Sequence, residues 1–142
     1  MTLISVSLPS REVLSPIAER FGLRLIVLFG SAARGMANSE SDIDLGVFVD
    51  RPLTVNKRLK LWSAFSSLFS VDVDLTVLNH VDPVLAFEAA RDGKALFEGE
   101  PYFWDKWKSY AFRQYWDTEK FRGDLKRYIS RRAQEIPHAS VE

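Results

Sequence analysis

Two apolar stretches of the sequence each contain a pair of aspartates separated by one residue. The first pair is Asp42 and Asp44, and the second pair is Asp72 and Asp74 within residues 71–78. In a β-strand, residues i and i+2 point to the same face, so each pair presents two carboxylates to one spot. Two like charges this close repel each other unless a cation neutralises them. The pattern predicts two strands, and if they are neighbours in a sheet their acidic faces meet.

Apolar periodicity and turn residues predict the other elements. The predicted helices span residues 10–21, 53–69, 83–92 and 101–132, and the predicted strands span residues 23–29, 43–49, 71–78 and 95–98, with a helical turn at residues 31–35. The first helix has a second candidate start at Ser15, because Pro16 lacks a backbone N–H and suits the first position of a helix. The last helix has a candidate break at Gly123. This order predicts an α+β fold: a small mixed β-sheet with helices packed on one face, plus an aromatic-rich C-terminal helix.

A glycine–serine bend follows the first predicted strand. Gly30 allows another part of the backbone to come close, and the N–H groups of the turn after it can receive a phosphate. The Ser31 hydroxyl adds one donor, and Arg34, three residues later on the same side of the turn, offers a fork of N–H groups. We therefore predict that these three residues bind a nucleotide. The alternative interpretation is an ordinary strand-to-helix turn, with Arg34 in a surface salt bridge.

The acidic pairs have the chemistry of a metal site. Carboxylate oxygens are hard ligands that favour Mg²⁺. Three carboxylates can hold two such ions about 3.5–4 Å apart, an arrangement that clamps an in-line phosphoryl displacement. Asp42 and Asp44 supply two of the three, and either Asp72 or Asp74 supplies the third. The alternative interpretation is that these aspartates cap strands or face solvent.

Residues 30–44 fit the signature G-S-x(10)-D-x-D and so resemble the DNA polymerase β-like nucleotidyltransferase superfamily. The fuller string GSAARG…SDIDL is similar to the minimal nucleotidyltransferase (MNT) group, and VDVDLTVLN resembles the strand that carries the third carboxylate in that group. The segment DPVLAFEAARDGKALFEGE and the aromatic C-terminal helix also resemble the group, so the similarity covers residues 23–132.

The resemblance implies a role for each matching residue. The glycine, serine and arginine of the bend would hold the triphosphate of the nucleotide. Asp42 and Asp44 would bind both metal ions. Asp74, rather than Asp72, would bind the catalytic metal and help to deprotonate the acceptor hydroxyl, and attack on the α-phosphorus would release pyrophosphate.

Many MNT proteins resemble the antitoxin half of HEPN/MNT toxin–antitoxin pairs. The resemblance therefore implies a nucleotidyltransferase that uses two Mg²⁺ ions to move AMP from ATP to a tyrosine hydroxyl of its partner, a HEPN ribonuclease toxin. This substrate rests on family analogy. One alternative is an antitoxin that blocks its toxin by contact without catalysis. The other is a nucleotidyltransferase for an aminoglycoside-like small molecule, although 142 residues leave little room for the added substrate domain of such enzymes.

Length and composition limit the number of domains, the binding partners and the compartment that we expect. The 142 residues suit one nucleotidyltransferase domain, with a core at residues 10–99 and a helical extension at residues 101–132. Basic and acidic residues number 19 each, so no overall charge draws the chain to nucleic acid or a membrane. The absence of cysteine excludes disulfides and thiolate zinc sites and fits a reducing compartment, so we expect a cytoplasmic protein. The sequence shows neither a signal-peptide pattern nor an apolar stretch of the roughly 20 residues that a membrane helix needs.

The predicted C-terminal helix contains more aromatic residues than one face of a helix on a small domain can bury. They are Phe103, Trp104, Trp107, Tyr110, Phe112, Tyr115, Trp116, Phe121 and Tyr128, and basic residues lie between them. Three interpretations stay open. The surplus forms an interface with a partner protein, where aromatic residues and arginine are enriched; or the helix is core with a solvated face; or its rings stack on RNA bases.

Overall fold

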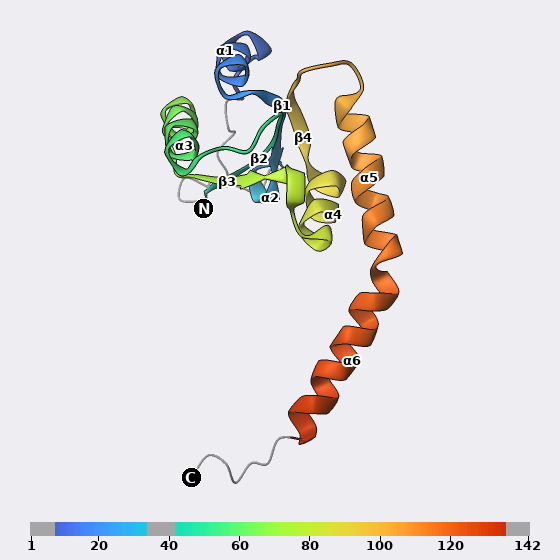
Figure 1. Cartoon of the computed structure of the whole chain (residues 1–142). Helices are drawn as coiled ribbons and strands as arrows, with labels where there is room; N and C mark the ends of the chain where they lie inside the picture. The colour runs from blue at the N-terminus through green and yellow to red at the C-terminus, as the bar shows by residue number, and fades with distance from the viewer. Residues whose placement is uncertain (1–7, 34–41, 136–142) are drawn as a thin grey trace, which may run out of the picture.

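The computed structural model describes residues 8–33 and 42–135, and Figure 1 shows how its elements are arranged. In chain order they are α1 (Arg11–Phe21), β1 (Leu23–Phe29), α2 (Gly30–Ala33), β2 (Ile43–Val49), α3 (Val55–Phe69), β3 (Val73–Val77), the 3-10 helix η1 (Leu78–His80), α4 (Pro83–Asp92), β4 (Lys94–Glu98), α5 (Phe103–Asp117) and α6 (Glu119–Glu135). The strands lie together among the helices, and α6 extends away from them (Figure 1). None of the helices in the described ranges combines the length and the apolar character that crossing a bilayer requires.

The sheet has the strand order β3-β2-β1-β4. β1 pairs antiparallel with β2 and with β4, whereas β2 and β3 are parallel. A parallel pair needs a crossover connection, and the 15-residue helix α3 provides it. The mixed sheet and the α+β class predicted from the sequence are confirmed. The parallel pairing also means that β2 and β3 begin at the same end of the sheet.

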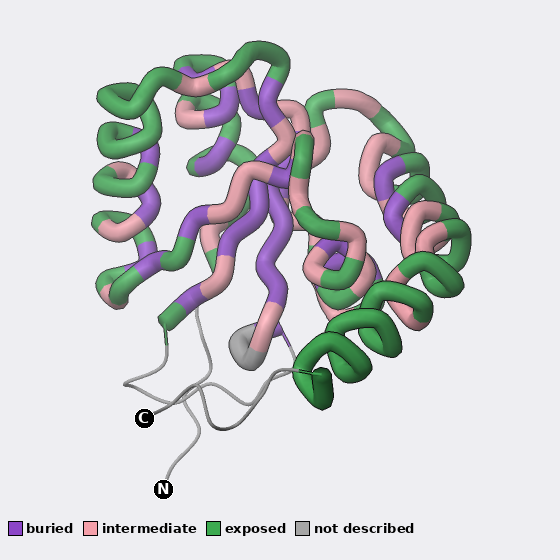
Figure 2. The backbone as a smooth tube through the Cα atoms, turned by 60° about the horizontal axis from the view of Figure 1, so that its bottom comes forward, coloured by how far each residue is buried: buried purple, intermediate pink, exposed green. Residues whose placement is uncertain are grey.

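Helices cover both faces of this sheet, so the expectation that they pack on one face is wrong. Ile26 and Leu28 of β1 pack with α1 and α3 in one apolar cluster. Leu25 and Val27 point the other way and pack with α4 and α5 in a second cluster. A strand whose residues are almost all buried needs cover on both faces. Figure 2 shows the buried positions gathered in the strands between the helices.

Side chains before the first residue of α1 and α4 fix where these helices begin. Ser10 is the N-cap of α1, and its hydroxyl accepts a hydrogen bond from the Val13 N–H at 3.4 Å. The alternative start at Ser15 is therefore wrong, and Pro16 lies inside the helix. Asp82 caps α4 in the same way, as the sequence predicts. Both caps satisfy N–H groups that the first turn of a helix leaves unpaired.

The C-terminal helical segment divides at Thr118, so the prediction of a break at Gly123 is wrong. The Thr118 hydroxyl donates to the Gln114 carbonyl at 2.7 Å. Arg122 reaches back across the division: its guanidinium donates to the Tyr115 carbonyl at 2.9 Å and lies over the Tyr115 ring. These side-chain contacts occupy the last carbonyls of α5 and end it there.

Asn79 in η1 joins the end of β2 to the chain that follows β3. Its side-chain N–H donates to the Val49 carbonyl at 2.8 Å, and its side-chain oxygen accepts from the Val49 N–H at 2.9 Å. We expect Asn79→Ala to lower the free energy of unfolding by about 1–3 kcal/mol, because two partly buried backbone groups lose their partner. Urea denaturation measures this. The exposed neighbour His80 is the control, and an Asn79→Ala midpoint as high as that of His80→Ala would contradict the prediction.

Candidate active site

The parallel register of β2 and β3 sets Asp44 directly beside Asp74. The Ile43 N–H donates to the Asp72 carbonyl at 2.9 Å, which holds the starts of the two strands together, and Asp42 immediately precedes β2. The apolar residues that alternate with these aspartates are buried in the cluster with α1 and α3. The carboxylates therefore point to the opposite face, which α4 covers. The fold sets the two strands side by side, which is the condition under which the sequence predicts that their acidic faces meet.

Gly30 lies against the Asp44 carboxylate at the end of β1. Antiparallel pairing sets Phe29 opposite Asp44, so the next residue of the chain reaches the carboxylate. A Cβ atom on Gly30 would stand 2.1 Å from Oδ2 of Asp44, and the φ angle of Gly30 is +73°. Both the close approach and the positive φ favour glycine. The bend that the sequence predicts to bind phosphate thus abuts the acidic cluster.

Burial raises the pKa of the Asp44 carboxyl above its ordinary value, and the negative charges of Asp74 and Asp42 raise it further. Asp44 is half-buried, whereas Asp42 and Asp74 are exposed. A carboxyl in this environment resists ionisation unless a cation compensates its charge. Within residues 8–33 and 42–135, no three carboxylate, imidazole or thiol groups stand close enough to form a ready-made metal cage. The charges of Asp42 and Asp74 therefore act on Asp44, although the three carboxylates do not already converge on one point.

A cavity of about 310 Å³ opens in front of this acidic cluster. It is lined by Phe29, Gly30, Asp44, Asp74 and Thr76 from the sheet and its bend, and by Leu85, Glu88, Arg91 and Asp92 from α4. Sequence reasoning misses the α4 residues. Glu88, Arg91 and Asp92 follow the spacing i, i+3, i+4, which places them on one side of a helix, and that spacing is the signal that reveals them. Asp74 belongs to the described lining and Asp72 does not.

Arg91 brings a positive charge to the α4 wall of the cavity. Its guanidinium donates to the Asp92 carboxylate at 2.8 Å and lies 5.5 Å from the centre of the Phe87 ring. The Arg91 side chain is half exposed, so the ion pair lies at the rim of the cavity. The cavity thus combines carboxylates from the sheet with an ion pair from α4.

The other two residues predicted to bind the nucleotide lie at the limit of what the structure describes. Ser31 follows Gly30 in α2, but its side chain is outside the described part. Arg34 lies outside the described residues. Their role in binding phosphate stays a prediction.

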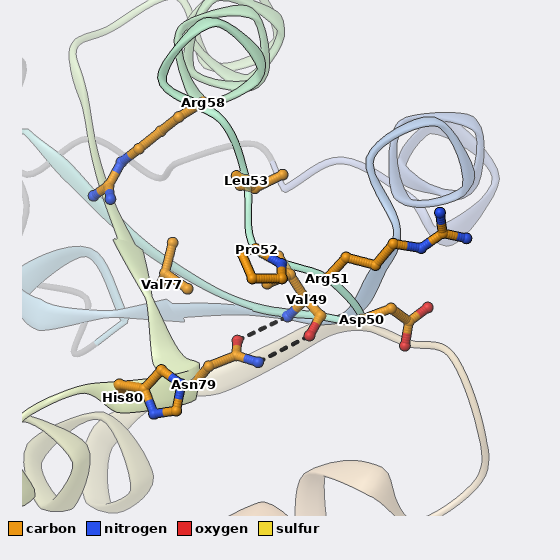
Figure 3. Close-up of a pocket in the computed structure, with 9 residues that line it drawn as sticks. All are labelled: Val49, Asp50, Arg51, Pro52, Leu53, Arg58, Val77, Asn79 and His80. Carbon is orange, nitrogen blue, oxygen red and sulfur yellow. Dashed lines mark hydrogen bonds between the residues drawn. The ribbon is translucent and has the colours of Figure 1, made fainter.

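A second pocket, of about 510 Å³, lies at the opposite ends of β2 and β3 and is drawn in Figure 3. It is lined by Val49, Asp50, Arg51, Pro52, Leu53, Arg58, Val77, Asn79 and His80. Figure 3 shows the Asn79 amide engaged with the backbone of β2, and the side chains of Arg51 and Arg58 extending in opposite directions. Its carboxylate, Asp50, already pairs with Arg24 at 3.4 Å. This pocket lacks grouped carboxylates, so the acidic cavity is the better candidate for an active site.

The family model for polymerase beta nucleotidyltransferases matches residues 12–102 of the sequence. The matched segment contains the bend at Gly30, both acidic pairs and the α4 wall. The chain belongs to the polymerase beta nucleotidyltransferase family. Membership confirms the family resemblance of the sequence.

Similar proteins in this family include the protein adenylyltransferase MntA of Aphanizomenon flos-aquae (strain 2012/KM1/D3), which is 32% identical over 96 residues. The alignment covers 61% of this chain and 64% of that relative, so the chain matches less than two thirds of the relative's length. A chain in the crystal structure of a toxin–antitoxin complex with AMP-PNP has a TM-score of 0.72 and 24% identity, covering 86% of this chain and 99% of that one. A chain in the complex of a tri-AMPylated Shewanella oneidensis HEPN toxin with its MNT antitoxin has a TM-score of 0.66 and 23% identity. The match covers 84% of this chain and 95% of that one. At these identities, the two structures show that the fold is shared.

Proposed function

We propose that this chain is a protein adenylyltransferase that moves AMP from ATP to a tyrosine hydroxyl of a HEPN-type toxin and thereby acts as its antitoxin. The observation that carries the proposal is the position of Asp44, held beside Asp74 by the strand register and against the Gly30 bend. The adenylyltransferase name of the relative supports the reaction. The neighbouring complexes, one with AMP-PNP and one with a tri-AMPylated toxin, support the donor and the acceptor. A reaction that consumes ATP fits a protein of the cytoplasm.

Asp42, Asp44 and Asp74 are the residues that would hold two Mg²⁺ ions. These residues fit Mg²⁺ because they offer hard carboxylate oxygens from adjacent strands, with Asp44 beside Asp74, and a cation would relieve the burial and the repulsion that raise the pKa of Asp44. The side chains must turn toward a common point to do so, because they are not yet gathered there. Bound Mg²⁺ supplies charge neutralisation to the triphosphate and polarises its α-phosphate.

The residues of the chain have separate tasks in this proposal. Gly30 leaves room for the Asp44 carboxylate at the bend where the triphosphate binds, and Ser31 and Arg34 donate hydrogen bonds to the triphosphate oxygens. Asp74, exposed on the edge strand β3, accepts the proton of the acceptor hydroxyl. The acceptor oxygen then bonds to the α-phosphorus while the bond from that phosphorus to the bridging oxygen breaks, and pyrophosphate leaves.

Isotope transfer tests the reaction. The chain is incubated with Mg²⁺, its co-expressed toxin and ATP labelled at either the α- or the γ-phosphate. We expect label from the α position on the toxin, and an intact mass that rises by one or more AMP units. Transfer of the γ label alone would make the protein a kinase and contradict the proposal.

One observation favours inhibition by contact as a second candidate function. In α6, within the described part of the chain, no residue is buried, and an apolar stripe lies exposed at Phe121, Leu125, Tyr128 and Ile129. The spacing i, i+4, i+7, i+8 places this stripe on one side of the helix, as in a helix that docks on a partner. An Asp44→Ala variant separates the two functions at native expression. If it still protects cells fully from the toxin, contact is sufficient and catalysis is dispensable.

A further inference from the structure

A second, apolar depression lies on the other side of Asp74, between α3 and the edge strand β3. Its volume is about 420 Å³, and it is lined by Val55, Arg58, Leu59 and Trp62 from α3 and by Val73, Asp74 and Leu75 from β3. We name it the α3–β3 groove. Val55 is 79% exposed, Leu59 61% and Trp62 42%. These three residues follow the spacing i, i+4, i+7, so α3 presents a continuous apolar stripe to solvent beside a candidate catalytic carboxylate.

Two hydrogen bonds fix the shape of the groove. The Trp62 indole N–H donates to the Val73 carbonyl at 2.7 Å, and the Arg58 guanidinium donates to the Leu75 carbonyl at 3.0 Å. Outward-facing carbonyls of an edge strand ordinarily offer themselves to an additional strand. Here α3 already occupies two of them, so a ligand engages the groove through side chains rather than by extending the sheet.

Asp74 lines both the α3–β3 groove and the acidic cavity that contains Gly30 and Asp44. A nucleotide whose triphosphate lies at Gly30 occupies the acidic cavity. A polypeptide in the groove lies on the α3 side of β3, whereas the Asp74 carboxylate points to the α4 side. Because β3 is an edge strand and Asp74 is exposed, a hydroxyl side chain of that polypeptide reaches the carboxylate around the edge of the strand, and the two substrates need not share a pocket. This arrangement separates donor from acceptor, as transfer between two bound substrates requires.

We propose that the α3–β3 groove is the acceptor site: it binds an apolar or aromatic polypeptide segment of the partner and delivers the hydroxyl of that segment to Asp74. The inference rests on the proposed function and adds the place and the chemistry of acceptor recognition. The lining favours a polypeptide over an adenine base. The N–H groups of Trp62 and Arg58 described above are engaged with the backbone of β3, and the rest of the surface is mainly apolar. An apolar segment buries well on such a surface, whereas the polar edge of a base loses its water without gaining donors.

Steady-state kinetics of AMP transfer with Leu59→Glu tests the proposal. We expect KM for the toxin to rise at least about tenfold, because a charge in an apolar contact disfavours the complex. KM for ATP should stay at the wild-type value. Val13→Glu, on the 45% exposed position of α1, introduces the same charge outside the groove and should leave both constants unchanged. Leu59→Met should restore the wild-type KM for the toxin.

Two outcomes overturn the acceptor site. An unchanged KM for the toxin in Leu59→Glu means that the groove does not contact the acceptor, and a raised KM for ATP means that it holds the base of the nucleotide. A photocrosslinking amino acid at position 59 tests, without need of catalysis, which segment of the toxin lies in the groove. We expect a crosslink to the toxin segment that carries the acceptor tyrosine. If the wild-type chain transfers no AMP, the proposed function fails, while the crosslink still shows whether the groove binds the toxin segment. Absence of that crosslink overturns the binding of the segment in the groove and leaves the proposed function untouched.

Discussion

Asp44→Asn is expected to reduce the rate of AMP transfer by about 100- to 1000-fold, the size of effect seen when one electrostatic contact to a transition state is removed. Asp44 lies beside Asp74 in the strand register and against Gly30 at the end of β1. The amide retains the size of the side chain and removes its charge. We therefore expect kcat to fall while the circular dichroism spectrum stays that of the wild type.

The same substitution should stabilise the protein when no divalent cation is present. The folded-state pKa of Asp44 is raised, so the folded protein binds a proton more tightly than the unfolded chain does. The stability that this proton contributes is fully present below the unfolded pKa of about 4 and is lost as the pH rises through the folded pKa. In EDTA, thermal unfolding should show a Tm that is higher for Asp44→Asn by about 1–3 °C at pH 7, a small value because the group is partly solvated. The difference should shrink as the pH falls toward 4.

Asp72→Asn is the matched control for both measurements. Asp72 is an exposed aspartate two residues before Asp74 and stands outside the described lining of the acidic cavity. Its loss should leave transfer and Tm near the wild-type values, and Mg²⁺ should raise the Tm of this variant but not that of Asp44→Asn. A loss of transfer in Asp72→Asn as large as in Asp44→Asn would assign the third carboxylate to Asp72 and contradict the role of Asp74.

Gly30→Ala is expected to remove most activity, by about 100-fold, through displacement of the Asp44 carboxylate. The new Cβ would stand 2.1 Å from Oδ2 of Asp44, so the carboxylate or the bend must move. Misplacement of a reacting group by about 1 Å is enough for a loss of this size. The φ angle of +73° adds about 1–2 kcal/mol of backbone strain to the folded state. Transfer assays and urea denaturation measure the two effects.

Gly22→Ala is the control that separates the effect of backbone strain from the effect of displacing the Asp44 carboxylate. Gly22 has a similar φ angle of +68°, but its nearest neighbour for an added Cβ is the Cβ of Asp50 at 3.8 Å, an ordinary contact. We expect Gly22→Ala to lose the stability that corresponds to the backbone strain alone, about 1–2 kcal/mol, and to keep its activity. Equal activity in the two variants would contradict the close packing of Gly30 against Asp44.

The sequence predicts the parts of the site that local pattern controls. Alternation of aspartates with apolar residues identifies the acidic faces of β2 and β3, and the glycine before a helical turn identifies the bend at Gly30. Strand neighbours depend on contacts between distant segments, so the pairing of Asp44 with Asp74 needed the structure. The sequence of a continuously apolar strand such as β1 does not show whether helices cover one or both of its faces. The expectation that helices pack on one face of the sheet fails for this reason.

The α4 wall and the end of α5 show two further limits. The spacing of Glu88 and Arg91 puts them on one side of α4, but only the fold sets α4 beside the aspartates. At the end of α5, Gly123 is the obvious breaker by composition, yet the hydroxyl of Thr118 and the guanidinium of Arg122 decide the position through contacts that span several residues. Side-chain competition of this kind is invisible to propensity alone.

A crystal structure of the chain with AMP-PNP and Mn²⁺ tests the central claim most directly, because anomalous scattering locates the metal independently of the protein. We expect manganese bound jointly by the carboxylates of Asp42, Asp44 and Asp74, with the triphosphate against Gly30. Carboxylates that point apart with no metal between them, or a triphosphate bound in the pocket of Asn79 at the other end of the sheet, would contradict this account.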